Sequence, residues 1–128
     1  MSIKCNPTFN SITNMGQIKL RNVSIACAND AKPCLVTLQI IKNPTLTNST
    51  PVYSNYETYS MASINTTHST TITGGATLLN TSIASNGNQF VDITDMDLFL
   101  NANETFSFAV KASASTDVSI SFCWSEII

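Results

Sequence analysis

Three regularly spaced tyrosines are the residues that most suggest a binding surface. Tyr53, Tyr56 and Tyr59 recur at every third position between Val52 and Met61, with Ser, Asn, Glu and Thr between them. Aromatic rings beside amides and hydroxyls suit carbohydrate sites and protein interfaces. The same rings could instead pack beneath a loop. The sequence therefore leaves open a partner or glycan surface and a purely structural role.

Groups that could catalyse a reaction or hold a metal are few. His68 is the only histidine and lies in a run of Thr and Ser, so we interpret it as a solvated loop residue. Asp92, Asp95 and Asp97 could offer oxygen ligands to a hard cation, but the EF-hand spacing is missing. We interpret them as exposed strand carboxylates. The sequence predicts no enzyme, no cofactor and no metal site.

Whether the four cysteines are free thiols or disulfides depends on the compartment in which the chain is made. Cys5, Cys27, Cys34 and Cys123 form no Cys-x-x-Cys motif, which gives a zinc site little support. The N-terminus lacks the apolar segment of a signal peptide, and no apolar run approaches the ~20 residues of a membrane span. Cytosolic synthesis favours free thiols. Residues 28–33 look like a hairpin loop, so a Cys27–Cys34 disulfide is the alternative.

The composition is that of a folded domain with an unusually neutral surface. Charged residues make up 11% of the chain, whereas 14 Asn, 16 Ser and 17 Thr supply most of the polar groups. A hydrophobic content of 43% argues against disorder. The formal net charge of −2 gives no general attraction to nucleic acid. A length of 128 residues fits one domain.

Alternation of apolar and polar residues predicts β-strands along most of the chain, because successive side chains of a strand point to opposite faces. We expect strands over residues 17–27, 35–42, 62–67, 70–73, 76–84, 89–94, 95–100, 105–112 and 118–124. The change of parity near Arg21 predicts a bulge. Gly74-Gly75 predicts a turn or a bulge, and Asn86-Gly87 predicts a hairpin. In residues 95–100 we expect Met96, Leu98 and Leu100 to face inward.

The last two of these runs carry the strongest alternation, and four small residues, Ser113 to Thr116, separate them. They are expected to form a β-hairpin on which the core condenses. The side chains expected in the core are Phe106, Phe108, Val110, Val118, Ile120, Phe122 and Trp124. The predicted fold class is all-β, a single antiparallel two-sheet sandwich of jelly-roll-like form. It spans residues 17–128, and residues 1–16 form an irregular N-terminal attachment arm.

Four short segments resemble a known kind of domain. They are Ile41–Thr47, Thr71–Gly75, Asp97–Leu100 and the closing Val118–Glu126. Together they resemble small β-sandwich domains of bacteriophage and other viral structural proteins, such as fibre heads and capsid decorations. The resemblance covers roughly residues 35–126. It implies a non-enzymatic protein, and it implies a trimer where the likeness is to fibre heads.

These observations lead to one expected function and one alternative. We expect a virion structural protein, made in the host cytoplasm, that assembles with itself as a homotrimer and with other virion proteins. The outward strand positions are neutral and could be buried against a partner without the cost of desolvating charge. They are Thr37, Gln39, Thr105, Ser107, Ser119 and Ser121. The alternative is a carbohydrate- or receptor-binding sandwich that recognises a host surface. Neither function involves nucleic acid or a membrane.

Overall fold

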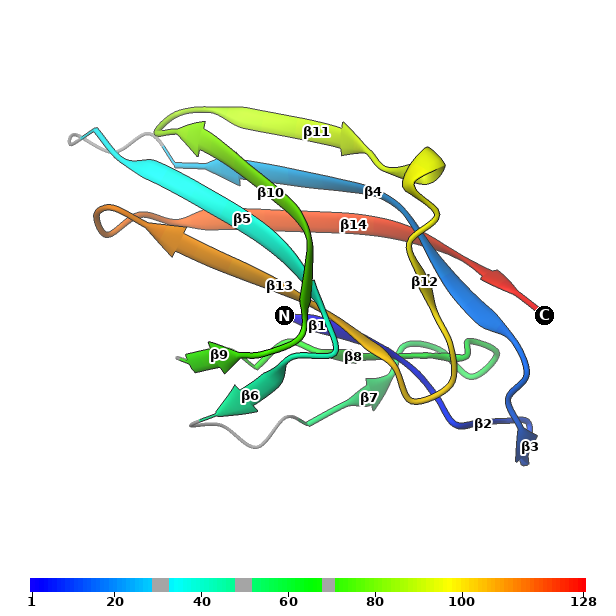
Figure 1. Cartoon of the computed structure of the whole chain (residues 1–128). Coiled ribbons are helices and arrows are strands. Elements are labelled where there is room, and N and C mark those ends of the chain that lie inside the picture. The colour runs from blue at the N-terminus through cyan, green and yellow to red at the C-terminus, as the bar shows by residue number, and fades with distance from the viewer. Residues whose placement is uncertain (29–32, 48–51, 68–70) are drawn as a thin grey trace.

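The computed structural model describes residues 1–28, 33–47, 52–67 and 71–128, and it is an antiparallel two-sheet sandwich (Figure 1). One sheet has six strands, in the order β10 (Ala76–Ala84), β5 (Leu35–Lys42), β13 (Thr105–Ala112), β1 (Ser2–Cys5), β8 (Ala62–Asn65) and β7 (Ser54–Asn55). The all-β sandwich predicted from the sequence is confirmed.

The second sheet is built on β4 (Gln17–Cys27). Strand β14 (Val118–Ile127) pairs along the whole of β4, so β11 (Asn88–Asp92) and β12 (Phe99–Leu100) share its opposite edge. Two small ribbons complete the fold, β2 (Thr8–Phe9) with β3 (Ile12–Thr13) and β6 (Thr45–Thr47) with β9 (Thr71–Thr73). One 3₁₀ turn, η1 (Thr94–Met96), follows β11.

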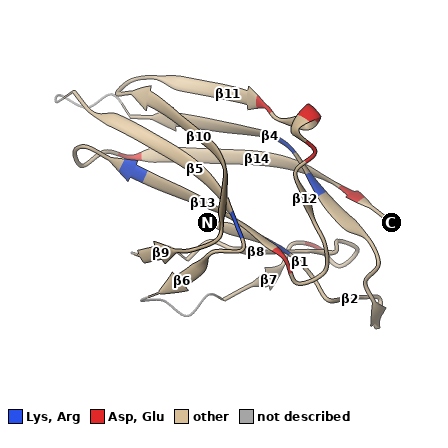
Figure 2. Ribbon diagram, in the orientation of Figure 1, with Lys and Arg blue, Asp and Glu red and all other residues tan. Residues whose placement is uncertain are grey.

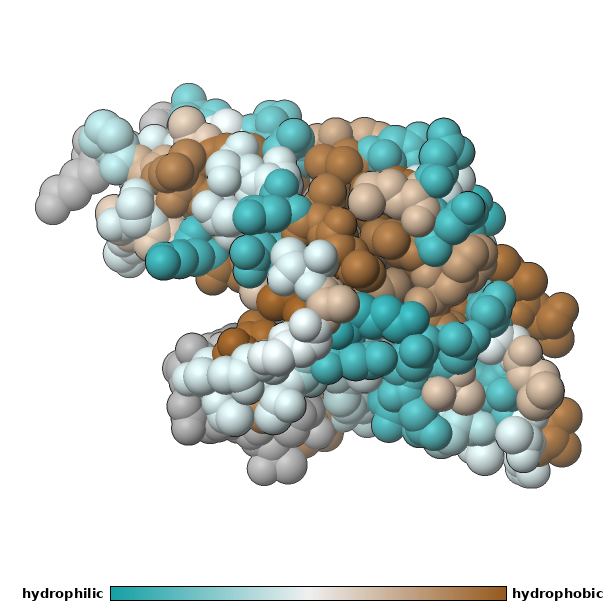
Figure 3. Space-filling view, in the orientation of Figure 1, coloured by the Kyte–Doolittle hydropathy of each residue, from teal (hydrophilic) through white to brown (hydrophobic). Residues whose placement is uncertain are grey.

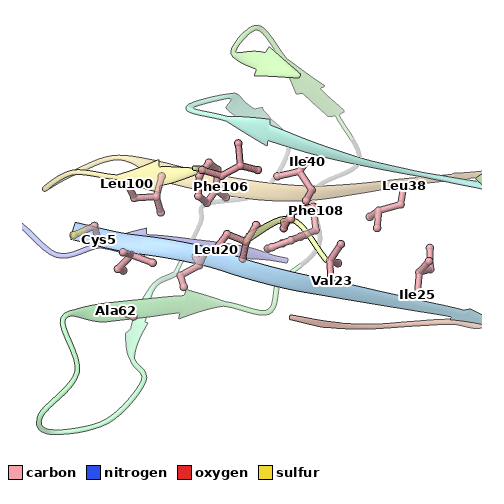
Figure 4. Close-up of a cluster of buried hydrophobic side chains, with 14 of the residues drawn as sticks. Cys5, Leu20, Val23, Ile25, Leu38, Ile40, Ala62, Leu100, Phe106 and Phe108 are labelled. Carbon is pink, nitrogen blue, oxygen red and sulfur yellow. The ribbon is translucent and has the colours of Figure 1, made fainter. Parts of the chain in front are cut away.

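The core lies between the two sheets. Phe106, Leu38 and Ile40 from the six-stranded sheet meet Leu20 and Val23 from β4, and all five are almost fully buried (Figure 4). The predicted bounds of β4, β5 and β10 match the observed ones. Burial of such apolar side chains is the main stabilising term of the fold, at about 25 cal/mol per Å² removed from water.

The two connections predicted as hairpins, from β10 to β11 and from β13 to β14, cross between the sheets. Strand β10 pairs with β5, whereas β11 pairs with β4. Strand β13 likewise pairs with β5 and β1, whereas β14 pairs with β4. Both predicted hairpins are therefore wrong. A two-residue type I′ turn needs positive φ at both central residues, and only Asn86 of the Asn86-Gly87 pair has it.

The connection from β4 to β5 crosses in the same way, so the loop after Cys27 is not a hairpin either. The structure keeps all four cysteines as free thiols, as predicted, and the alternative Cys27–Cys34 bridge is absent. Cys5, Cys27 and Cys34 are buried, and Cys123 is exposed.

The N-terminus is not the irregular arm that the sequence predicts. Strand β1 lies within the six-stranded sheet and pairs with both β13 and β8, so Ile3 and Cys5 are fully buried. Four residues are too few for alternation to stand out. Asn10 and Ser11 both have positive φ and form a two-residue turn between β2 and β3.

The predicted bulge in β4 is confirmed. Cys123 pairs with Asn22 and Trp124 pairs with Leu20, which leaves Arg21 as the extra residue. The predicted strand over residues 95–100 is wrong in its first half. Asp97 adopts a left-handed conformation with φ of 51° at the end of η1, and Met96 is therefore exposed instead of inward-facing.

Candidate binding surfaces

Strand β14 is the edge of its sheet, and this position explains a set of half-buried side chains. Val118, Ile120, Phe122 and Trp124 point toward the core but are only half-buried, because no further strand lies beyond β14. The prediction is correct that these side chains face the core, but it is wrong that they are mostly buried. Val110 on β13 is 41% exposed, contrary to prediction, because β1 pairs with β13 only over Thr105 to Ser107.

A continuous stack of rings runs from the core to the surface along this edge. Phe108 stacks on Phe122 with ring centroids 4.4 Å apart, and Phe122 lies 5.6 Å from Trp124. Trp124 in turn meets Tyr56 at 4.8 Å, with an angle of 76° between the rings. Edge-to-face contacts of this kind contribute about 0.5–1.5 kcal/mol beyond area burial. The stack therefore holds Tyr56 and Trp124 in a fixed relation.

Two adjoining hollows lie beside Tyr56, Phe122 and Trp124. The first, about 560 Å³, lies between β14 and the edge formed by Met1, β7 and Ile64 of β8. The second, about 430 Å³, adds Glu57, Tyr59, Ser60, Cys123 and Glu126 to the three shared side chains. We call Tyr56, Tyr59 and Trp124 the aromatic corner. Both volumes lie within the roughly 300–1,000 Å³ usual for small-ligand sites.

The aromatic corner is anchored by Glu126. Its carboxylate accepts hydrogen bonds from the Met61 amide at 2.9 Å and from Trp124 Nε1 at 3.2 Å, and it also accepts one from the Ser60 hydroxyl. The Tyr56 amide donates to the Ala62 carbonyl at 3.0 Å. These bonds tie the tyrosine-bearing segment to the end of β14, so the corner is preorganised.

The three tyrosines predicted to form one surface lie in two different places. Tyr56 and Tyr59 are exposed at the corner, whereas Tyr53 is half-buried over β1, where burial raises the pKa of its hydroxyl and a hydrogen bond with Ser2 partly offsets the rise. The Lys4 ammonium lies 5.7 Å from the centre of the Tyr53 ring. The loop-packing interpretation holds for Tyr53 alone. Sequence reasoning missed Trp124, which its strand pattern assigned to the core.

A second exposed surface is the outer face of the four-stranded sheet. The register places three side chains in each row across β14, β4 and β11. The first row is Ser119, Ala26 and Asn88, the second is Ser121, Ser24 and Phe90, and the third is Cys123, Asn22 and Asp92. The first two rows carry no charge, and Phe90 at the edge is 63% exposed. Most of β14 is uncharged in Figure 2.

The corresponding face of the six-stranded sheet is partly covered by the chain itself. Ser2 and Ser107 are 2% exposed and share a hydrogen bond of 2.8 Å, and Ser63 and Asn65 are also buried. Tyr53 lies over β1, and the ribbon of β6 and β9 faces Ser107 across a hollow of about 530 Å³. Figure 3 shows the notch between that ribbon and the body above it.

The acidic residues do not gather into a site. Asp97 forms an ion pair with Lys19, and the Asp92 carboxylate accepts a bond from the Thr94 amide at 3.0 Å, which lowers its pKa. Among the described residues, no three His, Cys, Asp or Glu side chains are grouped so as to hold a metal ion. His68 lies outside the described residues.

No helix in the described part of the chain is long and apolar enough to cross a membrane. No family model, no curated protein and no solved structure matches the chain.

Proposed function

We propose that this chain is a non-enzymatic structural protein of a virus particle surface, which acts by assembling with copies of itself and with other virion proteins. The observation that carries the self-assembly in this proposal is the bare outer face of the four-stranded sheet, whereas the virus particle is proposed from the resemblance of the sequence alone. Ser24, Ala26, Ser119 and Ser121 present small neutral groups there, and Phe90 adds an exposed ring at the edge.

Such a face suits contact between copies of one chain for two reasons. Hydroxyls and amides can be buried at an interface at a lower cost than charges. Rows of side chains that carry no charge, as the first two rows of this face do, also meet without the like-charge repulsion that opposes self-association. A closed ring of three copies, each presenting this sheet to the axis, is the arrangement we propose.

Sedimentation equilibrium of the intact chain tests the assembly. The expected result is one species of about three times the chain mass of 13.8 kDa at micromolar concentrations. Ser121→Arg should shift that species toward the monomer by placing a charge in the middle row of the face, on its edge strand β14. Asn80→Arg is the control, because Asn80 is an exposed residue of β10 in the other sheet. A 13.8 kDa species throughout would rule out a stable homo-oligomer.

The aromatic corner favours a second candidate, a carbohydrate- or receptor-binding module. Tyr56 and Tyr59 are 55% and 85% exposed and border hollows of ligand size. An exposed aromatic pair on a preorganised segment is what a recognition site needs. The corner adjoins the bare face, because Ser121 borders the first hollow and Cys123 borders the second, but Tyr56 and Tyr59 themselves lie off that face.

A further inference from the structure

The aromatic corner presents two rings at nearly right angles. The planes of the Tyr56 and Trp124 rings make an angle of 76° with each other. Tyr59 borders the second hollow together with these two rings. The face of an aromatic ring is electron-rich, so it attracts the slightly positive C–H groups that cover one side of a pyranose. The corner therefore offers stacking surfaces for a sugar ring.

The polar groups around the corner include two carboxylates, which only accept hydrogen bonds, and hydroxyl and amide groups, which both donate and accept them. Glu57 and Glu126 border the second hollow with the Ser60 hydroxyl, and Ser54 and Asn55 border the first. An ionised carboxylate accepts hydrogen bonds and donates none. Sugar hydroxyls can donate to such groups, so acceptors beside an aromatic platform match the two kinds of surface that a sugar has.

The charge around the corner selects among sugars. Its two carboxylates are accompanied by no Lys, Arg or His among the described residues that line either hollow. The Lys4 ammonium instead lies over Tyr53. A ligand with a carboxylate or sulfate would meet repulsion from Glu57 and Glu126 in the second hollow, and the N-terminal ammonium of Met1, whose pKa burial lowers, borders only the first. The site is therefore suited to uncharged sugars and unsuited to sialylated, uronic or sulfated ones.

We propose that the aromatic corner binds a neutral oligosaccharide, with one pyranose stacked at Tyr56, Tyr59 and Trp124 and its neighbour lying in the hollow along β14. This inference rests on the second candidate function, whose ligand class it names, and its three stacking rings are not residues of the bare face. Phe122 and Trp124 point inward from β14, whereas Ser119 and Ser121 point outward. Tyr59→Ala leaves the side chains of the bare face unchanged and Phe90→Ala leaves the corner rings unchanged, so the failure of one proposal can be told from the failure of the other.

A basic peptide is the other occupant that rings and carboxylates could attract, through cation–π contacts. The geometry favours the sugar. The two hollows adjoin at Tyr56, Phe122 and Trp124, which gives an elongated site, and only two of its corner rings are in mutual contact. An ammonium group is held best by rings that surround it. Salt separates the two occupants, since binding of a cation weakens with ionic strength and binding of a neutral sugar does not.

The single tryptophan gives the experiment its signal, because Trp124 lies in the corner itself. Its fluorescence is titrated with maltotetraose, cellotetraose, mannotetraose and lacto-N-tetraose, and with 3′-sialyllactose and a heparin tetrasaccharide as acidic probes. We expect saturable binding of at least one neutral probe, unchanged between 50 mM and 500 mM salt, and no binding of the acidic ones.

Matched variants locate the site. Tyr59→Ala should raise the Kd at least about tenfold, as expected for truncation of an aromatic anchor. Tyr59 is 85% exposed, so its removal should leave the fold intact. Phe90→Ala, which removes a 63% exposed ring on the other surface, should leave the Kd unchanged. The proposal is overturned if no neutral probe binds at millimolar concentration, if the acidic probes bind better, or if Tyr59→Ala and Phe90→Ala have equal effects. Salt-sensitive binding of a tetralysine peptide in place of the sugars would identify the other occupant.

Discussion

The outer faces of the two sheets are built from the same residue types but have opposite environments. Ser2 and Ser107 on the six-stranded sheet are buried and bond to each other, whereas Ser119 and Ser121 on the four-stranded sheet are exposed. The difference lies in the segments that follow β5 and β8, which return over one sheet and leave the other bare. An alternating pattern therefore shows which residues share a face, but not whether that face is covered.

This contrast decides which surface is available to a partner. Ser107 is one of the outward positions expected at an interface, but the chain's own segments already cover it. Ser119 and Ser121 stay accessible. The neutral composition that first suggested assembly thus has two causes, an internal polar layer over β1 and an exposed face on β4, β11 and β14.

The largest effect is expected between the two faces, in the core that both sheets share. Phe108 is 3% exposed and stacks on Phe122. Phe108→Ala should lower the free energy of unfolding by about 3–5 kcal/mol through lost transfer energy and the cavity left behind. Urea melts measure this. A loss below about 1 kcal/mol, the size of a surface effect, would show that the inward and outward faces are assigned the wrong way round.

A smaller loss of stability should distinguish the covered outer face of the six-stranded sheet from the bare outer face of the four-stranded sheet. Ser107→Ala removes one hydrogen bond from the buried Ser2 hydroxyl, which keeps its bond with Tyr53, and should cost about 0.5–1.5 kcal/mol. Ser119→Ala, the same change on the bare face, should stay within about 0.5 kcal/mol of the parent. The two urea melts are compared at a protein concentration where the parent is monomeric. Equal losses would remove the distinction between the faces.

The smallest effect concerns acid stability. Burial acts to raise the pKa of Glu104, but hydrogen bonds from Asn101 and the neighbouring Lys42 ammonium, 2.9 Å away, outweigh it and hold the pKa below its usual 4.5. A depressed pKa stabilises the fold above the unfolded-state value, and this stabilisation is lost as the pH falls through the folded-state value.

Glu104→Gln should therefore lower stability at pH 7 by no more than about 1 kcal/mol, because the pair is partly exposed. The difference from the parent should shrink below pH 4.5. Thermal melts from pH 7 to pH 3 check this. A difference that grows as the solution is acidified would contradict the assigned direction of the shift.

The sequence predicted the positions of most long strands correctly, but it did not predict which strands pair with each other. The bounds of β4, β5 and β10 and the bulge at Arg21 follow from alternation, which is a local property. Pairing depends on contacts between distant segments, such as β1 with β13, which no local pattern encodes. The turn residues favoured hairpins at Asn86-Gly87, but the need to fill both sheets around one core decided the connections.

The candidate site shows the same limit. The spacing of Tyr56 and Tyr59 pointed to a surface, but it also included Tyr53, which the fold directs over β1. Trp124 has the inward parity of a core residue and lies at the surface only because β14 is an edge strand. Glu126, which anchors the corner, gave no signal in the sequence.

Cys123 offers the most direct test of the central claim, that the bare face of the four-stranded sheet is the assembly surface. It lies on that face beside Asn22, and it is the exposed thiol of the four cysteines, the other three being buried. Maleimide labelling of the native protein is followed by mass spectrometry over a range of protein concentrations. The account predicts that labelling of Cys123 slows as concentration rises and the face becomes buried. A labelling rate that is the same at nanomolar and at tens of micromolar protein would contradict it.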